Sequence, residues 1–589
     1  MIKPTLSDVH QQFAEFFHGR RLAPYAYLVS KKLSEGHICV NLTAVEEEKT
    51  GMPAAYQAGL LPNPDLQDEI LVGAPGALQP FILDRSRLYL QRYFRYETMI
   101  LEGILRLLGS EASVRKGRCE ALLRHESLIR RLFPFPETAG ETDWQLAGVL
   151  FGAINNLTII TGGPGTGKTT TLANLLMVLY TLEPDLKIAL AAPTGKAAKR
   201  MAESLAQAVK NIPKPSSERI AALEPMTLHR LLRPVPGTPH FRHHAENPLS
   251  EDILVVDEAS MVDAALLAKL LDALAEGSRL ILLGDKNQLA SVEAGSILGD
   301  LCQDARRINV ADPLTAGMLM PLCRLEQTTL NHPLSGHIIE LKKSRRFKAD
   351  SGIGKLSRSL LAGDAEAVVS GPGIEIDHGY DPAILSDFIA GYEAYIQEPD
   401  IAAAYQKFNA LRILCAVWEG ERGVHRLNTL VEEYFRRKRL LQIKGAFYEH
   451  RPLIIGRNYY ELGLFNGDTG IVRPDAKGIL KAWFPDPSAP GGMRDILPHY
   501  LSDAQTVFAM TIHKSQGSEF DRVLVVLPEA DHTAFLTREL LYTAVTRARS
   551  NVTLQGTDAV IRQIAGRAVR RVSGINDRFN DEFTITLAN

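Results

Sequence analysis

The stretch TIITGGPGTGKTTT, residues 158–171, restricts the possible folds of this chain more than any other feature. An apolar run leads into six residues, 162–167, of which four are glycine, and an amphipathic helical pattern follows. This order matches GxxxxGK[ST], in which glycines let backbone N–H groups curl around phosphates and the helix start adds partial positive charge. The sequence therefore predicts a nucleotide-phosphate site at the end of a buried strand.

The residue types in this loop indicate how it would hold a nucleotide. We expect Lys168 to reach the β- and γ-phosphates and the Thr169 hydroxyl to ligate Mg²⁺. The residues expected to contact the nucleotide are Gly162, Gly163, Pro164, Gly165, Thr166, Gly167, Lys168, Thr169 and Thr170.

A carboxylate pair follows a second apolar run, in ILVVDEAS (253–260). Asp257 would hold Mg²⁺ directly or through water, and Glu258 would polarise an attacking water. Such a pair can also be a solvated strand cap. Because it follows the glycine-rich loop within one run of alternating strands and helices, we favour the catalytic interpretation and expect nucleoside triphosphate hydrolysis.

The apolar pattern divides the chain into several regions. Residues 1–135 are predicted to be mostly helical, and the prolyl stretch 132–143 indicates a boundary. Continuous apolar runs at 157–161, 188–194, 253–258 and 280–285 are typical of strands in a parallel sheet. We therefore expect one α/β domain at 136–330 and a second at 331–589. Turn signals within 445–505 indicate a small antiparallel insertion in the second.

Charge and cysteine content limit the classes of partner and location. The net charge of −2 gives no global basic field, so a nucleic-acid partner would have to bind local patches. The five cysteines form no CxxC pair, which favours reduced thiols in a cytoplasmic protein. No apolar run approaches the length of a membrane span, and the N-terminus lacks a signal-peptide core. We expect no membrane partner.

Polar loops follow most of the predicted strands. They are APTGKAAKRM (192–201), MTLHRLL (226–232), GDKNQLASV (284–292), KKSRRF (342–347), TIHKSQGSEF (511–520) and YTAVTRAR (542–549). Their order resembles that of the motifs of superfamily 1 helicases, in the branch that translocates 5′ to 3′. RHHAENPLSEDILVVDEASM, ELGLFNGDTGIV and ELLYTAVTRARS are more closely similar to the RecD family, the alpha subunits of RecBCD helicase–nucleases (exonuclease V).

This resemblance implies a fold and a nucleotide. The fold is α/β, with two RecA-like parallel-sheet motor domains (P-loop NTPase), a helical N-terminal domain and a small SH3-like β insertion. The nucleotide is ATP, used with Mg²⁺. By resemblance, Gln145 would read the adenine edge, Gln288 would contact the γ-phosphate, and Arg346 and Arg547 would be arginine fingers, while Gly517 lies near the nucleotide and Glu519 approaches the ribose. The family often has an aromatic residue at position 345, so Arg345 is given no role.

The resemblance also implies a single-strand DNA site between the two sheets. Its contacts would be mostly to phosphate, with little sequence preference. The residues expected there are Pro193, Thr194, Lys196, Thr227, His229, Thr511, His513, Lys514 and Ser515. The simpler alternative for residues 511–517 is a polar loop covering a sheet edge.

We therefore expect an ATP-dependent 5′→3′ DNA helicase. It would be the motor subunit of a RecBCD-like complex that acts on double-strand DNA ends in recombinational repair. Its partners would be a RecB-like nuclease/helicase and a RecC-like subunit, with residues 1–135 as the docking region. One alternative is a stand-alone RecD-like helicase, although residues 1–135 lack the paired hairpin pattern expected of its N-terminal extension. A second is a non-motor scaffold that binds nucleotide without hydrolysing it.

Overall fold

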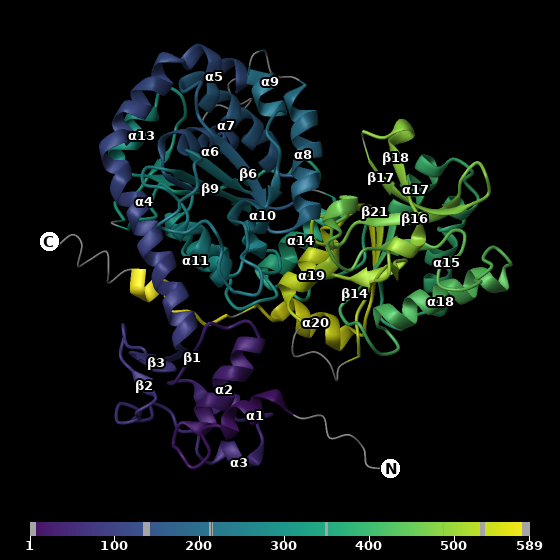
Figure 1. Ribbon diagram of the computed structural model, residues 1–589, viewed down its shortest axis with the longest axis horizontal. Coiled ribbons are helices and arrows are strands. Elements are labelled where there is room, and N and C mark those ends of the chain that lie inside the picture. Colours follow the sequence, from purple (N-terminus) through teal and green to yellow (C-terminus); the bar gives the residue numbers. More distant parts are fainter. Residues whose placement is uncertain are drawn as a thin grey trace.

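Two parallel sheets wrapped by helices form the body of the protein, and a smaller N-terminal domain lies below them in Figure 1. The computed structural model describes residues 8–133, 142–210, 214, 216–330, 332–347, 351–486, 488–529, 536–569 and 571–579. The boundary predicted at 132–143 lies largely outside these residues. None of the described helices combines the length and hydrophobicity that a bilayer span requires.

The first lobe is built on a six-stranded sheet. Its strands are β5 (Leu157–Thr161), β6 (Ile188–Ala192), β7 (Met226–Thr227), β8 (Ile253–Val256), β9 (Arg279–Gly284) and β12 (Ile338–Glu340). They lie in the order β12-β5-β9-β8-β6-β7, and every pairing is parallel. β5, β6, β8 and β9 are buried along their whole length, which explains their continuous apolar sequence. β12 lies past residue 330, so this sheet extends beyond the boundary expected from the sequence.

Helices cover both faces of this first sheet. They are α6 (Trp144–Ile154), α7 (Lys168–Leu182), α8 (Gly195–Val209), α9 (Ser216–Ala221), α10 (Leu228–Leu232), α11 (Ala264–Asp272), α12 (Ile297–Leu301) and α13 (Pro313–Leu319). Successive residues of β8 point to opposite faces of the sheet. Val255 packs in the cluster that contains α6, α7 and α8, whereas Val256 packs with α10 and α11. The carboxyl ends of the strands are thereby left for loops, where ligands bind in such sheets.

The second lobe contains a five-stranded parallel sheet. Its strands are β13 (Ile374–Asp377), β14 (Leu411–Cys415), β20 (Ala509–Thr511), β21 (Phe520–Val526) and β22 (Ala548–Gln555), in the order β13-β22-β21-β14-β20. Its helices are α14 (Gly352–Ala362), α15 (Pro382–Ala390), α16 (Glu393–Ile396), α17 (Ile401–Asn409), α18 (Val424–Arg437), α19 (Arg538–Val545) and α20 (Asp558–Gly566). β20 and β21 flank β14 on opposite sides, so the 511–519 loop leaves the carboxyl end of β20, passes β14 and enters β21 at its amino end.

The insertion in the second lobe is an antiparallel sheet, as predicted. It consists of β15 (Pro452–Ile454), β16 (Thr469–Pro474), β17 (Leu480–Pro485), β18 (Met493–Ile496) and β19 (Gln505–Thr506). All its pairings are antiparallel, and it has its own small core around Leu453, Val472 and Phe484. Figure 1 shows it on the side of the second lobe that faces α8.

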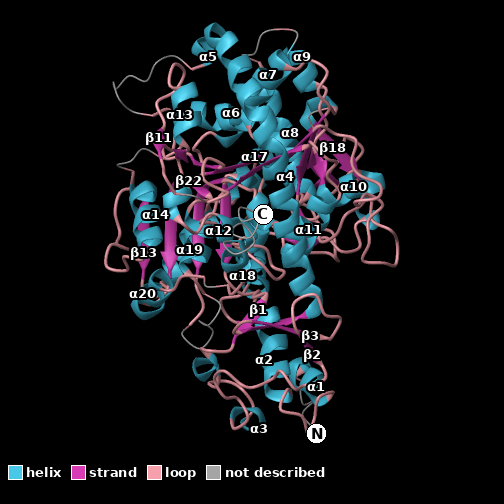
Figure 2. Cartoon of the chain, turned by 90° about the vertical axis from the view of Figure 1, so that its left-hand side faces the viewer, coloured by secondary structure: helices cyan, strands magenta, loops and turns pink. Residues whose placement is uncertain are grey.

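The N-terminal region contains more strand than the sequence predicted. α1 (Val9–Glu15), α2 (Ala23–Ser34) and α3 (Ala54–Gln57) are accompanied by β1 (Cys39–Asn41), β2 (Val72–Gly73), β3 (Phe81–Asp84) and β4 (Arg87–Leu90), in the order β1-β4-β3-β2. Strands this short carry no readable alternation. α4 (Gln91–Arg124) then runs from this small sheet along the first lobe, as Figure 2 shows, and α5 (Glu126–Leu132) follows it.

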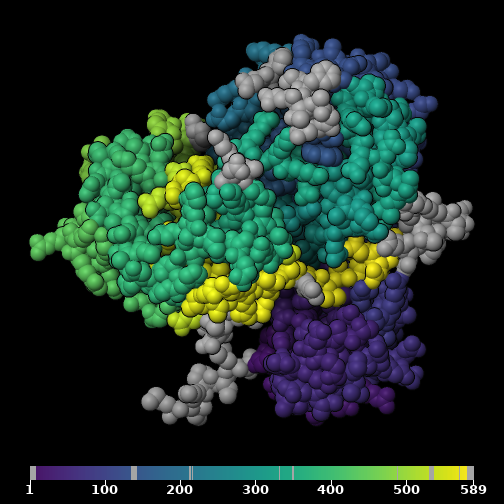
Figure 3. All heavy atoms as spheres, turned by 180° about the vertical axis from the view of Figure 1, so that it is seen from behind, coloured from purple at the N-terminus to yellow at the C-terminus, as the bar shows by residue number. Residues whose placement is uncertain are grey.

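The segment 571–579, here called the C-terminal strap, connects all three parts. It leaves the second lobe after α20 and passes between the first lobe and the N-terminal domain, visible as the yellow band in Figure 3. The Val572 N–H donates to His37 Nδ1, its carbonyl accepts from the Ile38 N–H, and the Ile575 and Phe579 side chains are buried in the first-lobe core. The Arg578 guanidinium lies 3.5 Å from the fully buried carboxylate of Glu97 on α4.

Candidate nucleotide cavity and neighbouring groove

The glycine-rich loop has the geometry that its sequence predicted. β5 delivers it and α7 begins at Lys168, with Gly165 at φ 75° and Gly167 at φ 90°. A Cβ on Gly167 would lie 2.2 Å from Gln145 Nε2, so this position requires glycine for both space and conformation. The Lys168 ammonium donates to the carbonyls of Gly162 (2.6 Å) and Gly163 (3.3 Å), which holds its charge over the loop.

The carboxylate pair lies opposite this loop. Asp257 follows β8, and Glu258 is in the left-handed region at φ 51°, which turns its side chain away from the strand direction. Burial, followed by the nearby Glu258 charge, raises the pKa of Asp257. Two carboxylates held close together out of water favour a bound cation.

A third loop connects the first lobe to the second. Asp285, after β9, accepts hydrogen bonds from Gln288 Nε2 and from the Tyr542 hydroxyl of the second lobe, both at 3.1 Å. The Leu289 N–H donates to Thr543 Oγ1 at 3.1 Å. Gln288 Oε1 is buried and has no hydrogen-bond partner within the described residues. Gln288 thus has one unused acceptor while its loop is tied to α19.

Arginines of the second lobe face this region. Arg346 donates to Glu519 at 2.6 Å, while Arg547 is buried and donates to the carbonyls of Thr543 (3.1 Å) and Ser518 (3.3 Å). Burial and the charges of neighbouring arginines lower the pKa of Arg346 to about 10. The 344–347 segment rests on the glycine-rich loop, because the Arg345 N–H donates to the Gly165 carbonyl at 2.8 Å.

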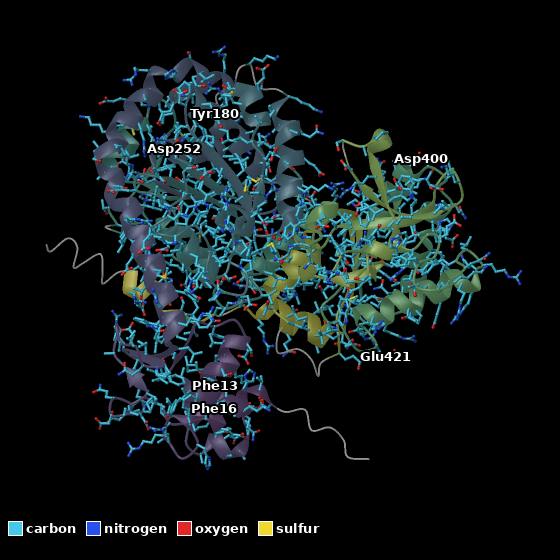
Figure 4. The ribbon with its side chains drawn as sticks, in the orientation of Figure 1. Phe13, Phe16, Tyr180, Asp252, Asp400 and Glu421 are labelled. Carbon is cyan, nitrogen blue, oxygen red and sulfur yellow. The ribbon has the colours of Figure 1, made fainter. Side chains whose placement is uncertain are left out.

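These groups border one cavity of about 830 Å³ between the lobes. Figure 4 shows the side chains of both lobes, with Tyr180 and Asp252 marking the first lobe and Asp400 and Glu421 the second. Predicted residues on its wall are Pro164, Gly165, Thr166, Gly167, Lys168, Thr169, Thr170, Asp257, Glu258, Gln288, Arg346, Glu519 and Arg547. Such a concentration of cations and backbone N–H groups suits a polyphosphate.

Three predicted nucleotide contacts have other partners in this structure. The Gln145 amide donates to the Thr166 carbonyl at 2.9 Å and accepts from Arg345 at 3.0 Å, so in this structure both ends of the amide brace the loop. Glu519, expected near a ribose, instead pairs with arginines. Gly517 contributes its carbonyl to Arg200. Gln145 adjoins the cavity without lining it.

A second cavity, the strand groove, measures about 410 Å³ and lies beside the first. Predicted DNA residues on its wall are Pro193, Thr194, Lys196, Thr227, His229, His513 and Lys514. Thr194 and Thr227 are helix N-caps whose hydroxyl oxygens accept from the N–H groups of Ala197 and Arg230. Their hydroxyl protons remain able to donate to a phosphate oxygen.

Two predicted DNA residues do not reach the groove wall. Ser515 is completely buried and donates to the Ile512 carbonyl, and Thr511 accepts from the Lys514 N–H at 3.2 Å. Both close the turn that presents His513 and Lys514. The sequence pattern did not reveal this. Residues 513–515 form a single turn of 3₁₀ helix, which leaves His513 and Lys514 accessible and buries Ser515.

The groove also contains residues that the sequence analysis missed. Asn458, Tyr460, Asn466 and Gly467 come from the insertion. The ring of Phe465 packs against Gly195, where a Cβ would lie 2.3 Å from it. The Asn466-Gly467 turn predicted the insertion, but no local signal placed it against α8. Arg200, on the wall of the nucleotide cavity, was missed as well.

Lys196 is the most perturbed cation of the groove. Burial, only partly offset by Asp468, lowers its pKa to about 8. Burial also lowers the pKa of Lys514, whose ammonium lies 5.0 Å from the centre of the Trp418 ring. Burial disfavours the charged forms of these lysines, and an anion that enters the groove would favour the charged forms again.

Comparisons with known proteins place these features in a family context. Three family models match the chain: an AAA domain at residues 145–294, a UvrD-like helicase C-terminal domain at 506–554, and the RecBCD enzyme subunit RecD N-terminal domain at 3–89. The chain is 34% identical to the RecBCD enzyme subunit RecD of Mycolicibacterium smegmatis, over 94% of this chain and 92% of that protein.

Two further relatives extend the comparison. The RecBCD enzyme subunit RecD of Haemophilus influenzae is 32% identical, over 86% of this chain and 82% of its own length. The ATP-dependent RecD2 DNA helicase of Deinococcus radiodurans is 30% identical over 75% of this chain, which corresponds to 54% of that protein. The similarity to the Mycolicibacterium smegmatis subunit covers 94% of this chain and thus includes the N-terminal region as well as both lobes.

Proposed function

This chain belongs to the RecD family of RecBCD enzyme subunits, and we propose that it is the 5′→3′ motor of such a complex. Family membership makes it an ATP-dependent DNA helicase that acts in a RecBCD-like assembly. The finer proposal is that it forms a heterotrimer with a RecB-like nuclease/helicase and a RecC-like subunit. There it would draw one strand of an opened double-strand end through the strand groove during recombinational repair.

The observation that carries this proposal is the position of the 511–519 loop. Its first part, His513 and Lys514, lines the strand groove, while Glu519 lines the nucleotide cavity. A movement of one lobe relative to the other therefore changes both sites together. Closure around ATP and opening after hydrolysis would shift the grip on the strand, which is how two such lobes convert turnover into translocation.

We assign the chemistry of the nucleotide cavity as follows. Lys168 binds the β- and γ-phosphates, and Thr169 and Asp257 are placed to hold Mg²⁺, whose charge would offset that of the phosphates when bound. Glu258 orients and deprotonates the attacking water, and Gln288 uses its unpaired acceptor to position it. Arg346 and Arg547 stabilise the charge that develops on the transferred phosphoryl group.

On the DNA side, contacts to the backbone dominate. Thr194, Thr227 and His229 would hold the strand from the first lobe, and His513 and Lys514 from the second. The start of α8 adds partial positive charge. These groups recognise phosphate and give little sequence preference.

A stand-alone helicase is the second candidate function, supported by the RecD2 relative. The chain matches just over half of that protein, while it matches nearly all of the RecD subunits and the N-terminal RecD model. This difference favours a subunit that docks through its N-terminal domain. The third possibility, a non-hydrolysing scaffold, is disfavoured because the hydrolytic groups surround one cavity.

DNA-dependent ATP hydrolysis tests the proposal. The full chain, alone and co-purified with its partners, should hydrolyse ATP faster as single-stranded DNA is added. Lys168→Gln should lose hydrolysis while keeping the circular dichroism spectrum of the wild type. A flat DNA titration, or near-normal turnover in Lys168→Gln, would contradict the assignment.

A further inference from the structure

Arg200 stands outside the residues assigned above, yet it reaches across the cavity. It lies on α8 of the first lobe, and its guanidinium donates to the Gly517 carbonyl and to Glu519, both of the second lobe. It lines the nucleotide cavity together with Glu258 and Lys168. Arg200 is thus a first-lobe cation whose hydrogen-bond and ion-pair partners within the described residues lie on the opposite wall.

Glu519 is the shared partner of several arginines. One carboxylate oxygen accepts from Arg200 and from Arg346, and the other lies 3.4 Å from Arg549 Nε. Glu519 thus contacts three arginines, of which Arg549 also pairs with Asp521 at 3.5 Å, and the Glu519 side chain is only 11% exposed. The wall carries excess positive charge that a polyphosphate would complement.

The surroundings of Arg200 indicate which phosphate it would meet. Burial lowers its pKa, Glu519 is the carboxylate in direct contact with it, and the charges of Glu258 and Asp257 in the same cavity also act on it. Glu258 is the group assigned to the water that attacks the terminal phosphate. Because Arg200 shares the cavity wall with Glu258 and reaches Glu519 on the opposite wall, we expect its guanidinium to meet the γ-phosphate rather than the α- and β-phosphates.

α8 also gives Arg200 a mechanical connection to the strand groove. The first turn of this helix, with Thr194 and Lys196, lines the groove, and the second turn carries Arg200. On the far wall, the Gly517 carbonyl that Arg200 binds follows directly after Gln516, which lines the groove. Any change of partner at Arg200 is transmitted to both walls of the groove.

We propose that Arg200 binds the terminal phosphate of ATP and that Glu519 is the counter-ion from which it exchanges. This inference rests on the proposed nucleotide site. When a triphosphate enters, Arg200 leaves Glu519 and Gly517 for the γ-phosphate, which unties the 513–519 loop from α8. A diphosphate provides no such partner, so Arg200 returns to Glu519 after phosphate release. The residue thereby distinguishes ATP from ADP and reports the difference to the strand groove.

Nucleotide binding provides the test. A fluorescent non-hydrolysable triphosphate analogue and the matching diphosphate are titrated, each with Mg²⁺, into the full chain. Arg200→Ala should weaken triphosphate binding at least about tenfold, because it removes a charge-assisted hydrogen bond, and should leave diphosphate binding within about twofold. Triphosphate binding by Arg200→Lys should fall between that of the wild type and that of Arg200→Ala, because lysine keeps the charge but lacks the paired N–H donors of the guanidinium group.

Two further variants separate this role from a merely structural one. Lys199, the preceding residue, also bridges the lobes by donating to the Pro485 carbonyl at 2.8 Å, but it does not line the nucleotide cavity. Lys199→Ala should leave the preference for triphosphate unchanged. Glu519→Gln alone should tighten triphosphate binding, and it should do so less in the Arg200→Ala background, because only the part of the effect that acts through Arg346 and Arg549 then remains.

A second readout uses the strand. In the wild type, the triphosphate analogue should change the affinity for a single-stranded oligonucleotide, and Arg200→Ala should reduce that change. The inference is overturned if Arg200→Ala weakens both nucleotides equally or neither, or if Lys199→Ala reproduces its effect. Weaker binding of both nucleotides in Glu519→Gln would also overturn it and would return Glu519 to the ribose. Near-normal ATP hydrolysis by Lys168→Gln, in contrast, would contradict the assignment of the nucleotide site itself.

Discussion

Raising the pH should weaken strand binding through one lysine. Lys196 lines the strand groove, and burial lowers its pKa to about 8. A phosphate beside it would favour the charged form and raise that pKa again. Because free protein loses this proton above pH 8 while the complex retains it, binding takes up a proton in that range. Affinity should therefore fall as pH rises.

The size of the effect follows from the pKa. At pH 7 about nine in ten Lys196 side chains are protonated, and at pH 9 about one in ten, so the dissociation constant should rise roughly tenfold between these values. Fluorescence anisotropy of a labelled poly-dT oligonucleotide measures it. The ionic strength must be held constant, because phosphate contacts are strongly salt-dependent.

Substitutions at the same position identify the source of the effect. Lys196→Arg keeps a permanent charge, so its affinity should change only about twofold over the same range, with Lys514 as the source of the remainder. Lys196→Gln should bind more weakly at every pH and show the same flat profile. If Lys196→Arg follows the wild-type curve, the titrating group is elsewhere and the assignment of the groove loses its main electrostatic support.

Two other predictions concern the arginines. Arg346→Ala should lower kcat by about 10²–10³ with a much smaller change in nucleotide affinity, because its contact strengthens in the transition state; equal losses in steady-state kcat and in equilibrium binding would contradict this. Arg578→Ala leaves the buried Glu97 carboxylate without its cation and should destabilise docking of the C-terminal strap by about 3–5 kcal/mol, measured as faster amide exchange in 571–579. Burial raises the pKa of Glu97 and the Arg578 charge opposes that shift, so losing Arg578 raises this pKa further, and the loss relative to wild type should grow as the pH rises through the pKa that Glu97 has in the folded wild type. Asp577→Ala, which breaks the more exposed pair with Arg87, should cost less than about 1 kcal/mol, and a similar cost for both variants would count against the buried pair.

The motor lobes were predictable because their signals are local. β5 and β9 read as continuous apolar runs since both faces are covered, and the glycine-rich loop carries its own conformational requirement at Gly167. The strands of the N-terminal sheet, at two to four residues, and β12, at three, are too short for such a pattern. They are fixed by their neighbours rather than by their own sequence.

The site was predictable where motif residues act through their own loops. Lys168, Asp257 and Gln288 lie on the cavity wall as expected. What the sequence did not indicate depends on contacts between the lobes: the pairing of Arg200 with Glu519, and the insertion closing the strand groove through Tyr460. The position of the C-terminal strap was not indicated either, since it depends on distant contacts: Gly574 donates to Glu97 on α4, and Ile575 and Phe579 pack in the first-lobe core.

Strand displacement tests the central claim, that nucleotide turnover between the two lobes moves a DNA strand in one direction. Duplexes with a 5′ single-stranded tail and with a 3′ tail are offered to the chain, alone and co-purified with its partners, with ATP and Mg²⁺. A Lys168→Gln subunit serves as the control. The wild-type subunit should open the 5′-tailed duplex and require ATP, and the Lys168→Gln subunit should fail to open it. Opening driven by the wild-type subunit from the 3′ tail, or undiminished by Lys168→Gln, would contradict this claim.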